Sequence, residues 1–109
     1  MGKKVLLPME VVEEIKRRRR AYKNSRDALH LAISQLINEV EQAGEIEIIW
    51  NRPIYFGKIY IRDDNLARLR ALSAKYRCSY GRVLLSYLIQ KRKKEGILGY
   101  MGGVEGGKR

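Results

Sequence analysis

The sequence predicts a mostly α-helical domain with a short antiparallel β-ribbon, built from two copies of one strand–helix–helix unit. Two observations lead to this prediction. Residues 3–44 and 57–96 share one order of an alternating apolar run, a basic helical stretch that reaches a tyrosine, a polar turn and a second helical stretch. Each helical stretch places its apolar residues three and four positions apart, as an amphipathic helix does. One unit has too little apolar surface to fold alone, so we expect both units to share one core.

The two copies align residue by residue through the first helix, and the second copy has one more residue in the turn that follows. Aligned positions share their apolar or aromatic character: Val5 with Ile59, Val12 with Leu66, Tyr22 with Tyr76 and, after the turn, Leu29 with Leu84. The alternative is two unrelated pairs of amphipathic helices. The predicted organisation is a first unit at 1–44, a linker at 45–56, a second unit at 57–96 and a flexible glycine-rich tail at 97–109.

Short strands are expected at residues 4–7 and 58–61, which contain β-branched and aromatic residues in alternation. Alternation directs one set of side chains to the core: Val5, Leu7, Ile59 and Ile61. It directs the other set outward: Lys4, Leu6, Lys58 and Tyr60.

Each strand is followed by a predicted helix, which begins at Pro8 in the first unit and at Asp63-Asp64 in the second. The buried stripes of these first helices are Val11, Val12, Ile15 and Tyr22, and then Leu66, Leu69 and Leu72. The second helices are expected to bury Leu29, Ala32, Ile33, Leu36 and Ile37, and then Val83, Leu84, Tyr87 and Leu88. A capping box at 24–27 and a Ser79 cap begin them, and Gly44 and Gly96 end them.

The linker is predicted to contain a strand of its own. Residues 45–48 alternate in polarity, and residues 51–53 are typical of a turn, so a small hairpin could lead into the second strand. Trp50, Ile54 and Phe56 are expected to cover one end of the core.

The charge balance indicates a polyanionic partner. Of 109 residues, 23 are Lys or Arg and 12 are Asp or Glu, which gives a formal net charge of +11. The single cysteine and single histidine exclude an internal disulfide and a His/Cys zinc site within one chain. Apolar runs are too short for a membrane span of about 20 residues. We therefore expect an intracellular protein, in the cytoplasm or nucleoid, or in the host cytoplasm if the chain is viral.

The repeated unit resembles the ribbon–helix–helix family of DNA-binding repressors. In the second copy the resemblance rests on KIYIRDDNLARLRALSAKYRCSYGRVLLSYLI, and in the first on KVLLPMEVVEEI and NSRDALHLAISQLI. The first copy departs from the family in its shorter turn and in Leu6, where family members usually have a polar residue. The resemblance implies two strands paired over four helices, here as a pseudo-dimer within one chain, although pairing between chains stays open. Such tandem units are similar to regulators encoded by archaeal viruses and plasmids.

A two-stranded ribbon fits the major groove, where its outward side chains reach base edges. The expected base-reading residues are Lys4, Leu6, Lys58, Tyr60 and Arg62. Arg62 could instead form a surface ion pair with Asp63 or Asp64, and a solvated strand face is the alternative for the two lysines. By the resemblance, backbone N–H groups at the start of the second helices would bind phosphate, at Asn24, Ser25, Arg26, Ser79 and Tyr80.

Other polar clusters allow a functional and a structural interpretation. The basic run at 16–20 either contacts phosphates or forms a solvated helix face, with Glu13 and Glu14 pairing with Arg17 and Arg18. The run at 91–94 suits a helix C-terminus in any case. His30 and Cys78 have no catalytic partners in the sequence, and no nucleotide-binding, zinc-protease or nucleophile-elbow motif occurs.

These observations predict a double-stranded DNA-binding transcriptional regulator, a repressor by its resemblance, rather than an enzyme. We expect no cofactor, metal, membrane or small-molecule substrate, and chains that self-associate side by side on DNA. Two alternatives stay open. One is a protein that coats or shapes nucleic acid without reading its sequence, since attraction to phosphate carries no sequence information. The other is an antitoxin-like module whose tail folds on a protein partner.

Overall fold

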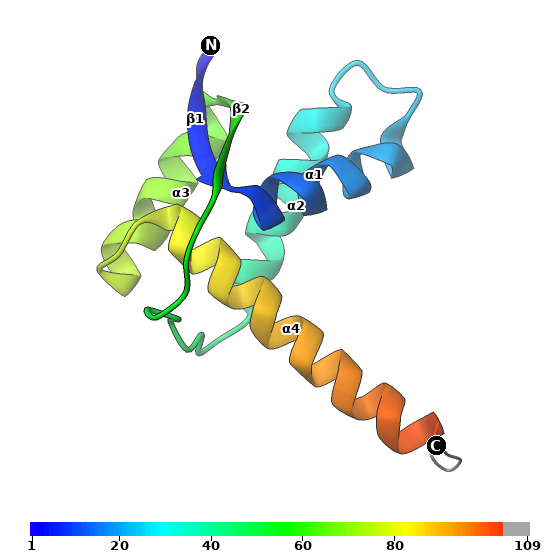
Figure 1. Ribbon diagram of the computed structural model, residues 1–109. Helices are drawn as coiled ribbons and strands as arrows, with labels where there is room; N and C mark the ends of the chain where they lie inside the picture. The colour runs from blue at the N-terminus through cyan, green and yellow to red at the C-terminus, as the bar shows by residue number, and fades with distance from the viewer. Residues whose placement is uncertain (104–109) are drawn as a thin grey trace.

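The computed structural model describes the backbone of residues 1–103 and the side chains of residues 1–96. It confirms a mostly helical fold with one two-stranded antiparallel sheet (Figure 1). The elements in chain order are β1 (Gly2–Pro8), α1 (Met9–Arg19), a short 3₁₀ turn η1 (Arg20–Tyr22), α2 (Ala28–Gln42), β2 (Phe56–Arg62), α3 (Asp63–Tyr76) and α4 (Tyr80–Gly103). In this described part, no helix combines the length and the apolar character that crossing a membrane requires.

The two strands pair with each other within the chain. Val5 lies opposite Ile59, and the pairing extends from Gly2 opposite Arg62 to Pro8 opposite Phe56. Val5 and Ile59, which the predicted repeat aligns, form the central pair of this register. The predicted inner face is confirmed: Leu7, Ile59 and Ile61 are buried and Val5 is half-buried.

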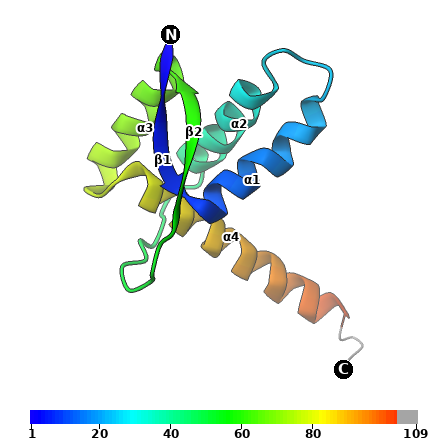
Figure 2. The same ribbon diagram turned by 45° about the horizontal axis from the view of Figure 1, so that its top comes forward.

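The four helices pack beneath the ribbon as two pairs that share one core. α1 packs against α2 and α4, and α3 packs against the same two helices (Figure 2). Most of the predicted stripe residues are buried, and Tyr22, Leu29 and Tyr87 are half-buried. Leu85 is also buried, although helical spacing alone did not single it out.

The predicted strand at 45–48 and its hairpin are wrong, because residues 44–55 have no regular structure. The linker lies along α4, whose side chains bind its backbone groups. The Ile49 N–H donates to Ser86 Oγ at 2.9 Å, and Arg82 Nη1 donates to the Ile49 carbonyl at 2.7 Å. Gln90 accepts from the Glu47 N–H at 3.1 Å. Since these helix side chains satisfy the linker's polar backbone, it needs no partner strand.

Gly44 and Gly96 were both predicted to end a helix, and only the prediction for Gly44 is confirmed. Gly44 follows α2 with a φ of +79°, a left-handed conformation that glycine adopts without steric cost. α4 continues past Gly96 to Gly103, because a glycine within a helix costs only about 1 kcal/mol relative to alanine. Residues 104–109 of the expected flexible tail lie outside the described residues.

Two glycines of α4 should respond oppositely to the same substitution. A Cβ on Gly81 would lie 2.8 Å from Pro8 Cδ, whereas a Cβ on Gly96 would meet nothing within 4 Å. We expect Gly81→Ala to lower the free energy of unfolding by about 1–3 kcal/mol, because the Pro8 ring must move. Gly96→Ala should raise it by about 0.5–1 kcal/mol through helix propensity. Urea denaturation measures both, and a stable Gly81→Ala protein would contradict the close contact.

Candidate nucleic-acid interface

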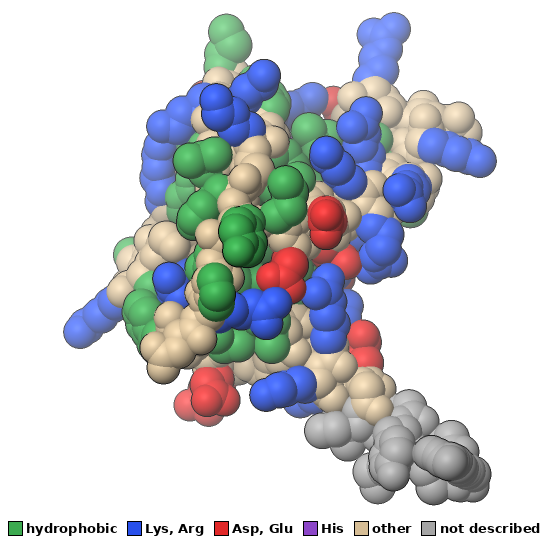
Figure 3. Space-filling model, viewed as in Figure 1, with side chains coloured by type: hydrophobic (Ala, Val, Ile, Leu, Met, Phe, Trp, Pro, Cys, Tyr) green, Lys and Arg blue, Asp and Glu red, His purple; other side chains and the backbone are tan. Residues whose placement is uncertain are grey.

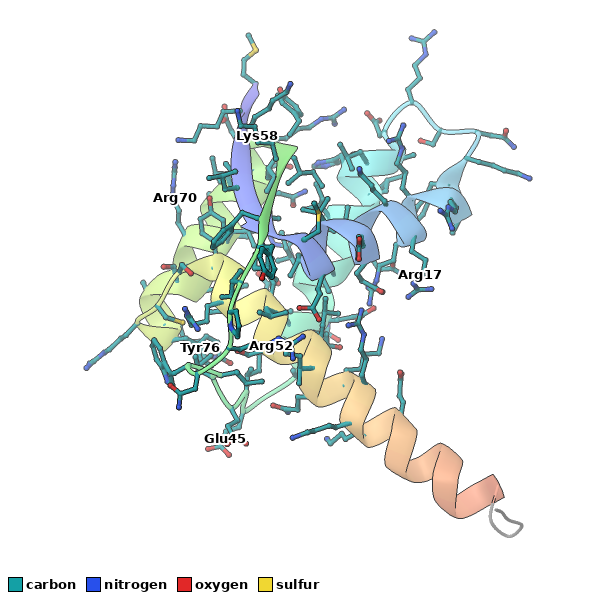
Figure 4. All side chains as sticks on the ribbon, viewed as in Figure 1. Arg17, Glu45, Arg52, Lys58, Arg70 and Tyr76 are labelled. Atoms are coloured by element: carbon teal, nitrogen blue, oxygen red, sulfur yellow. The ribbon has the colours of Figure 1, made fainter. Side chains whose placement is uncertain are left out.

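The outer face of the ribbon carries the four residues that alternation directs outward. Lys4 lies opposite Tyr60 and Leu6 opposite Lys58, so the four side chains share one face of the sheet. All four are exposed, with 57% of Leu6 and 41% of Tyr60 accessible to solvent. Figure 1 shows the two strands in front of the helices, and Figure 4 shows Lys58 on the ribbon. The ribbon therefore presents two lysines, one phenol and one aliphatic side chain together.

Phe56 also belongs to this outer face, although sequence analysis assigned it to packing. It lies opposite Pro8 and is 55% exposed. Its position follows from the alternation that places Lys58 and Tyr60 outward, so the sequence contained this signal. Trp50 is likewise 59% exposed, and the Arg82 guanidinium lies 5.2 Å from its ring centre. The prediction that Trp50 and Phe56 cover the core is wrong.

The exposed aromatic residues gather at the Pro8–Phe56 end of the ribbon. Tyr55 is 80% exposed, and its carbonyl accepts from the Met9 N–H at the start of α1. Ile54, in contrast, packs partly against the core, as expected. Figure 3 shows hydrophobic side chains along the middle of this face, with Lys and Arg side chains on both sides of them. The outer surface thus combines apolar and cationic groups.

Arg62 pairs with a residue that sequence analysis did not consider. It lies opposite Gly2 at the other end of the ribbon, and its Nη2 donates to Asp27 Oδ1. The hydrogen bond from Arg62 lowers the pKa of the Asp27 carboxyl. Neither Asp63 nor Asp64, the partners weighed from the sequence, forms this pair. Arg62 therefore ties the ribbon to the beginning of α2.

The starts of the two second helices differ in their caps. In the first unit the capping box is not formed: α2 begins at Ala28, and Asn24, Ser25 and Arg26 lie exposed in the preceding loop. In the second unit Ser79 caps α4, because its Oγ accepts from the Arg82 N–H at 3.3 Å. Tyr80, the other predicted phosphate-binding residue there, is the half-buried first residue of α4.

The basic run at 16–20 divides into structural and exposed residues. Arg18 is only 8% exposed and donates to Glu14 at 2.7 Å and to Glu39 of α2 at 2.7 and 3.0 Å. Arg17 also binds Glu14, through its Nε at 3.1 Å. Of the predicted pairings of Glu13 and Glu14 with these arginines, those of Glu14 are confirmed, whereas Glu13 forms no ion pair among the described residues. Arg18 therefore joins α1 to α2, whereas Arg17 pairs only within α1.

A third helix completes this network. The Tyr87 hydroxyl donates to Glu39 Oε1 at 3.0 Å, and Lys91 Nζ lies 3.4 Å from the same oxygen. Burial and the hydrogen bond to Glu39 raise the pKa of Tyr87 to about 12, so the phenol remains a donor. Arg92 lies 3.7 Å from Glu14. Half of the basic run at 91–94 is therefore paired with carboxylates of other helices.

The carboxylates of Glu14 and Glu39 make the free energy of unfolding depend on pH. Burial alone would raise the pKa of Glu14, and likewise that of Glu39, but hydrogen bonds from arginine outweigh it and lower both pKa values. A carboxyl with a lowered folded pKa stabilises the fold above its ordinary pKa, 4.5 for Glu, and loses this contribution as the pH falls through the folded value.

We therefore expect the free energy of unfolding to fall as the pH drops from about 5 to 3, and to fall less steeply in Glu14→Gln. The substitution removes one titrating group while keeping its size. Urea denaturation at several pH values measures the two slopes. Parallel slopes for the wild type and Glu14→Gln would show that Glu14 is not held ionised by its arginines.

His30 and Cys78 lie in structural surroundings. His30 Nδ1 is 3.1 Å from the Asn65 side-chain amide, which also contacts the His30 carbonyl. Burial raises the pKa of the Cys78 thiol, which lowers its fraction of reactive thiolate. Among the described residues, no group of three or more His, Cys, Asp or Glu side chains could hold a metal ion.

A comparison of the chain with protein-family models, with curated proteins and with solved structures gives no match.

Proposed function

We propose that this chain is a transcriptional regulator that inserts the β1–β2 ribbon into the major groove of double-stranded DNA. One observation carries the proposal: a two-stranded antiparallel ribbon whose exposed outer face bears Lys4, Lys58 and Tyr60. A ribbon of this kind fits the groove, and lysine can donate to guanine O6 and N7. Tyr60 adds a hydroxyl that can donate or accept, and a ring that can lie against a thymine methyl group.

We further propose that the chain is a pseudo-dimer of two ribbon–helix–helix units. Two features support this arrangement. The register is symmetric about Val5 and Ile59, which the repeat aligns. Each strand also ends beside the start of a second helix, since Arg62 binds Asp27 before α2, and Pro8 contacts Gly81 in the first turn of α4. Pro8 and Arg62 occupy the same position in the two copies.

The proposed pseudo-dimer is chemically asymmetric, so its preferred site should be non-palindromic. The repeat aligns Lys4 with Lys58, but it aligns Leu6 with Tyr60. Leu6 can offer only apolar contact, for example with a thymine methyl group. The two halves of one site would therefore be read by different groups.

Selection of bound sequences from a random duplex pool, at near-physiological salt, tests the proposal. We expect enrichment of a short motif without two-fold symmetry. A palindromic motif would contradict the asymmetric reading and favour two chains on one site. If no duplex is bound at all, the proposal fails, and a protein partner, as in the antitoxin-like alternative, becomes the better explanation.

A coating or architectural protein is the second candidate, and the outer face gives it specific support. Leu6 and Phe56 place two apolar side chains on the proposed reading surface, where polar groups would discriminate bases better. This candidate predicts a selected pool without a motif, together with tight binding that weakens steeply as salt rises.

A further inference from the structure

Four exposed cations lack the carboxylate partners that neighbouring arginines have. They come from the end of α1, from η1 and from the loop after it, and they line an open hollow of about 400 Å³ together with Ser25 and Ala28. We name this site the basic hollow; its cations are Lys16, Arg19, Arg20 and Lys23. All four are exposed, and in the part of the chain that the structure describes none lies within 4 Å of a carboxylate.

Only some of the arginines near the end of α1 lack a carboxylate partner. Arg17 and Arg18 bind Glu14, whereas the next two arginines bind no acidic side chain of the described chain. Four like charges around one hollow repel one another, and this repulsion is relieved when an anion binds between them. Phosphate suits such a site, because guanidinium groups donate to its oxygens in pairs.

The basic hollow lies near one end of the ribbon. Its Ser25 is two residues from Asp27, to which Arg62 at the end of β2 is bound. Figures 1 and 3 share one view, in which the end of α1 and the loop after it lie beyond α2 from the ribbon, and Lys and Arg side chains cover this region on the viewer's side. A duplex seated on the ribbon can therefore continue over the basic hollow.

The second copy keeps only part of this positive charge, since the repeat aligns Lys16 with Arg70 and Lys23 with Arg77. The repeat aligns Arg19 and Arg20 with Ser73 and Ala74, which carry no charge. At the opposite end of the ribbon, exposed aromatic rings take the corresponding place, with Trp50 against Arg82. The two ends of the ribbon thus offer different surfaces to flanking DNA.

We propose that the basic hollow binds backbone phosphates of the duplex held by the ribbon. These phosphates lie beyond the Gly2–Arg62 end of the ribbon, and the opposite end has no such contact. This inference rests on the proposed function. The contact extends the footprint on one side and gives the chain a fixed direction on its site. The bound group is a phosphodiester of DNA rather than a free anion, since the hollow is open and its loop is tied to the ribbon through Asp27 and Arg62.

Salt-dependent binding of a selected duplex tests this inference with two variants of equal charge. The first replaces the cations of the hollow: Lys16→Gln, Arg19→Gln, Arg20→Gln and Lys23→Gln. The control replaces four exposed cations at the end of α3 and in the middle of α4: Lys75→Gln, Arg77→Gln, Lys93→Gln and Lys94→Gln. The slope of log K against log salt changes by about 0.9 for each phosphate that the protein no longer neutralises. We expect the magnitude of this slope to fall by about 2–4 in the first variant and by less than about 1 in the control.

Hydroxyl-radical footprinting of the same duplex shows which part of the DNA the hollow protects. The first variant should lose protection at one end of the footprint, with the centre unchanged. Equal slopes in the two variants, or loss of protection at both ends, would overturn the inference.

The ribbon variant Lys58→Ala/Tyr60→Ala separates this inference from the proposed function. If it loses specific binding while the hollow variant binds like the control, the hollow has no role and the proposed function stands. If the hollow variant loses binding and the ribbon variant does not, the ribbon is not the reader, and both proposals fail.

Discussion

Arg18→Ala should lower the free energy of unfolding by about 3 kcal/mol, the largest stability effect we expect from a charged residue of this chain. The guanidinium is buried between Glu14 of α1 and Glu39 of α2. Its removal deprives Glu39 of both hydrogen bonds from Arg18 and leaves Glu14, itself only 7% exposed, with Arg17 as its remaining hydrogen-bond donor. Breaking a buried ion pair on one side costs about 3–5 kcal/mol, and partial exposure of Glu39 favours the lower end. Urea denaturation at pH 7 measures the change.

Arg19→Ala is the matched control, because Arg19 is the next residue on the same helix and is exposed. It should change stability by less than about 0.5 kcal/mol. A second control combines Arg18→Met with Glu14→Gln and Glu39→Gln. Removing the charges together should restore part of the loss, since well-packed neutral residues often replace a buried ion pair at little cost. Equal effects of Arg18→Ala and Arg19→Ala would show that the network does not hold the helices together.

Lys58→Ala/Tyr60→Ala should weaken binding to a selected duplex by roughly 30-fold to 10,000-fold. Each good base contact contributes about 1–3 kcal/mol of discrimination, and the variant removes two groups from the centre of the outer face. Binding to random duplex should fall much less, because only one positive charge is removed. Competition between the two duplexes at fixed salt measures the difference. The fold should persist, since both side chains are exposed.

Two single variants control for charge and for the aromatic ring. Lys93→Ala removes one exposed charge from α4 and should weaken binding to both duplexes slightly and equally. Tyr60→Phe keeps the ring and removes the hydroxyl, so it isolates any hydrogen bond to a base. If the double variant weakens binding to selected and random duplexes by the same factor, the ribbon does not read sequence and the coating protein becomes the preferred function.

The sequence by itself determined the elements whose signals are local. Alternation placed Lys4 and Lys58 outward and Ile61 inward, because successive side chains of a strand point to opposite faces. Helical spacing identified most of the core, and the cap at Ser79 and the left-handed Gly44 depend on their immediate neighbours. The predicted repeat aligns Val5 with Ile59, and these two residues form the central pair of the observed register.

Tertiary structure alone decided the features that depend on distant partners. Residues 45–48 alternate like a strand, yet they remain irregular because α4 side chains, not a strand, bind the backbone of the linker. Helical spacing places residue 18 on the inward stripe with Val11 and Ile15, but the carboxylate that lets an arginine be buried there comes from Glu39, on another helix. Arg62 likewise binds Asp27 rather than its neighbours in sequence, because packing of the ribbon over α2 brings the two together. Side-chain pairing follows three-dimensional proximity, which local sequence patterns do not contain.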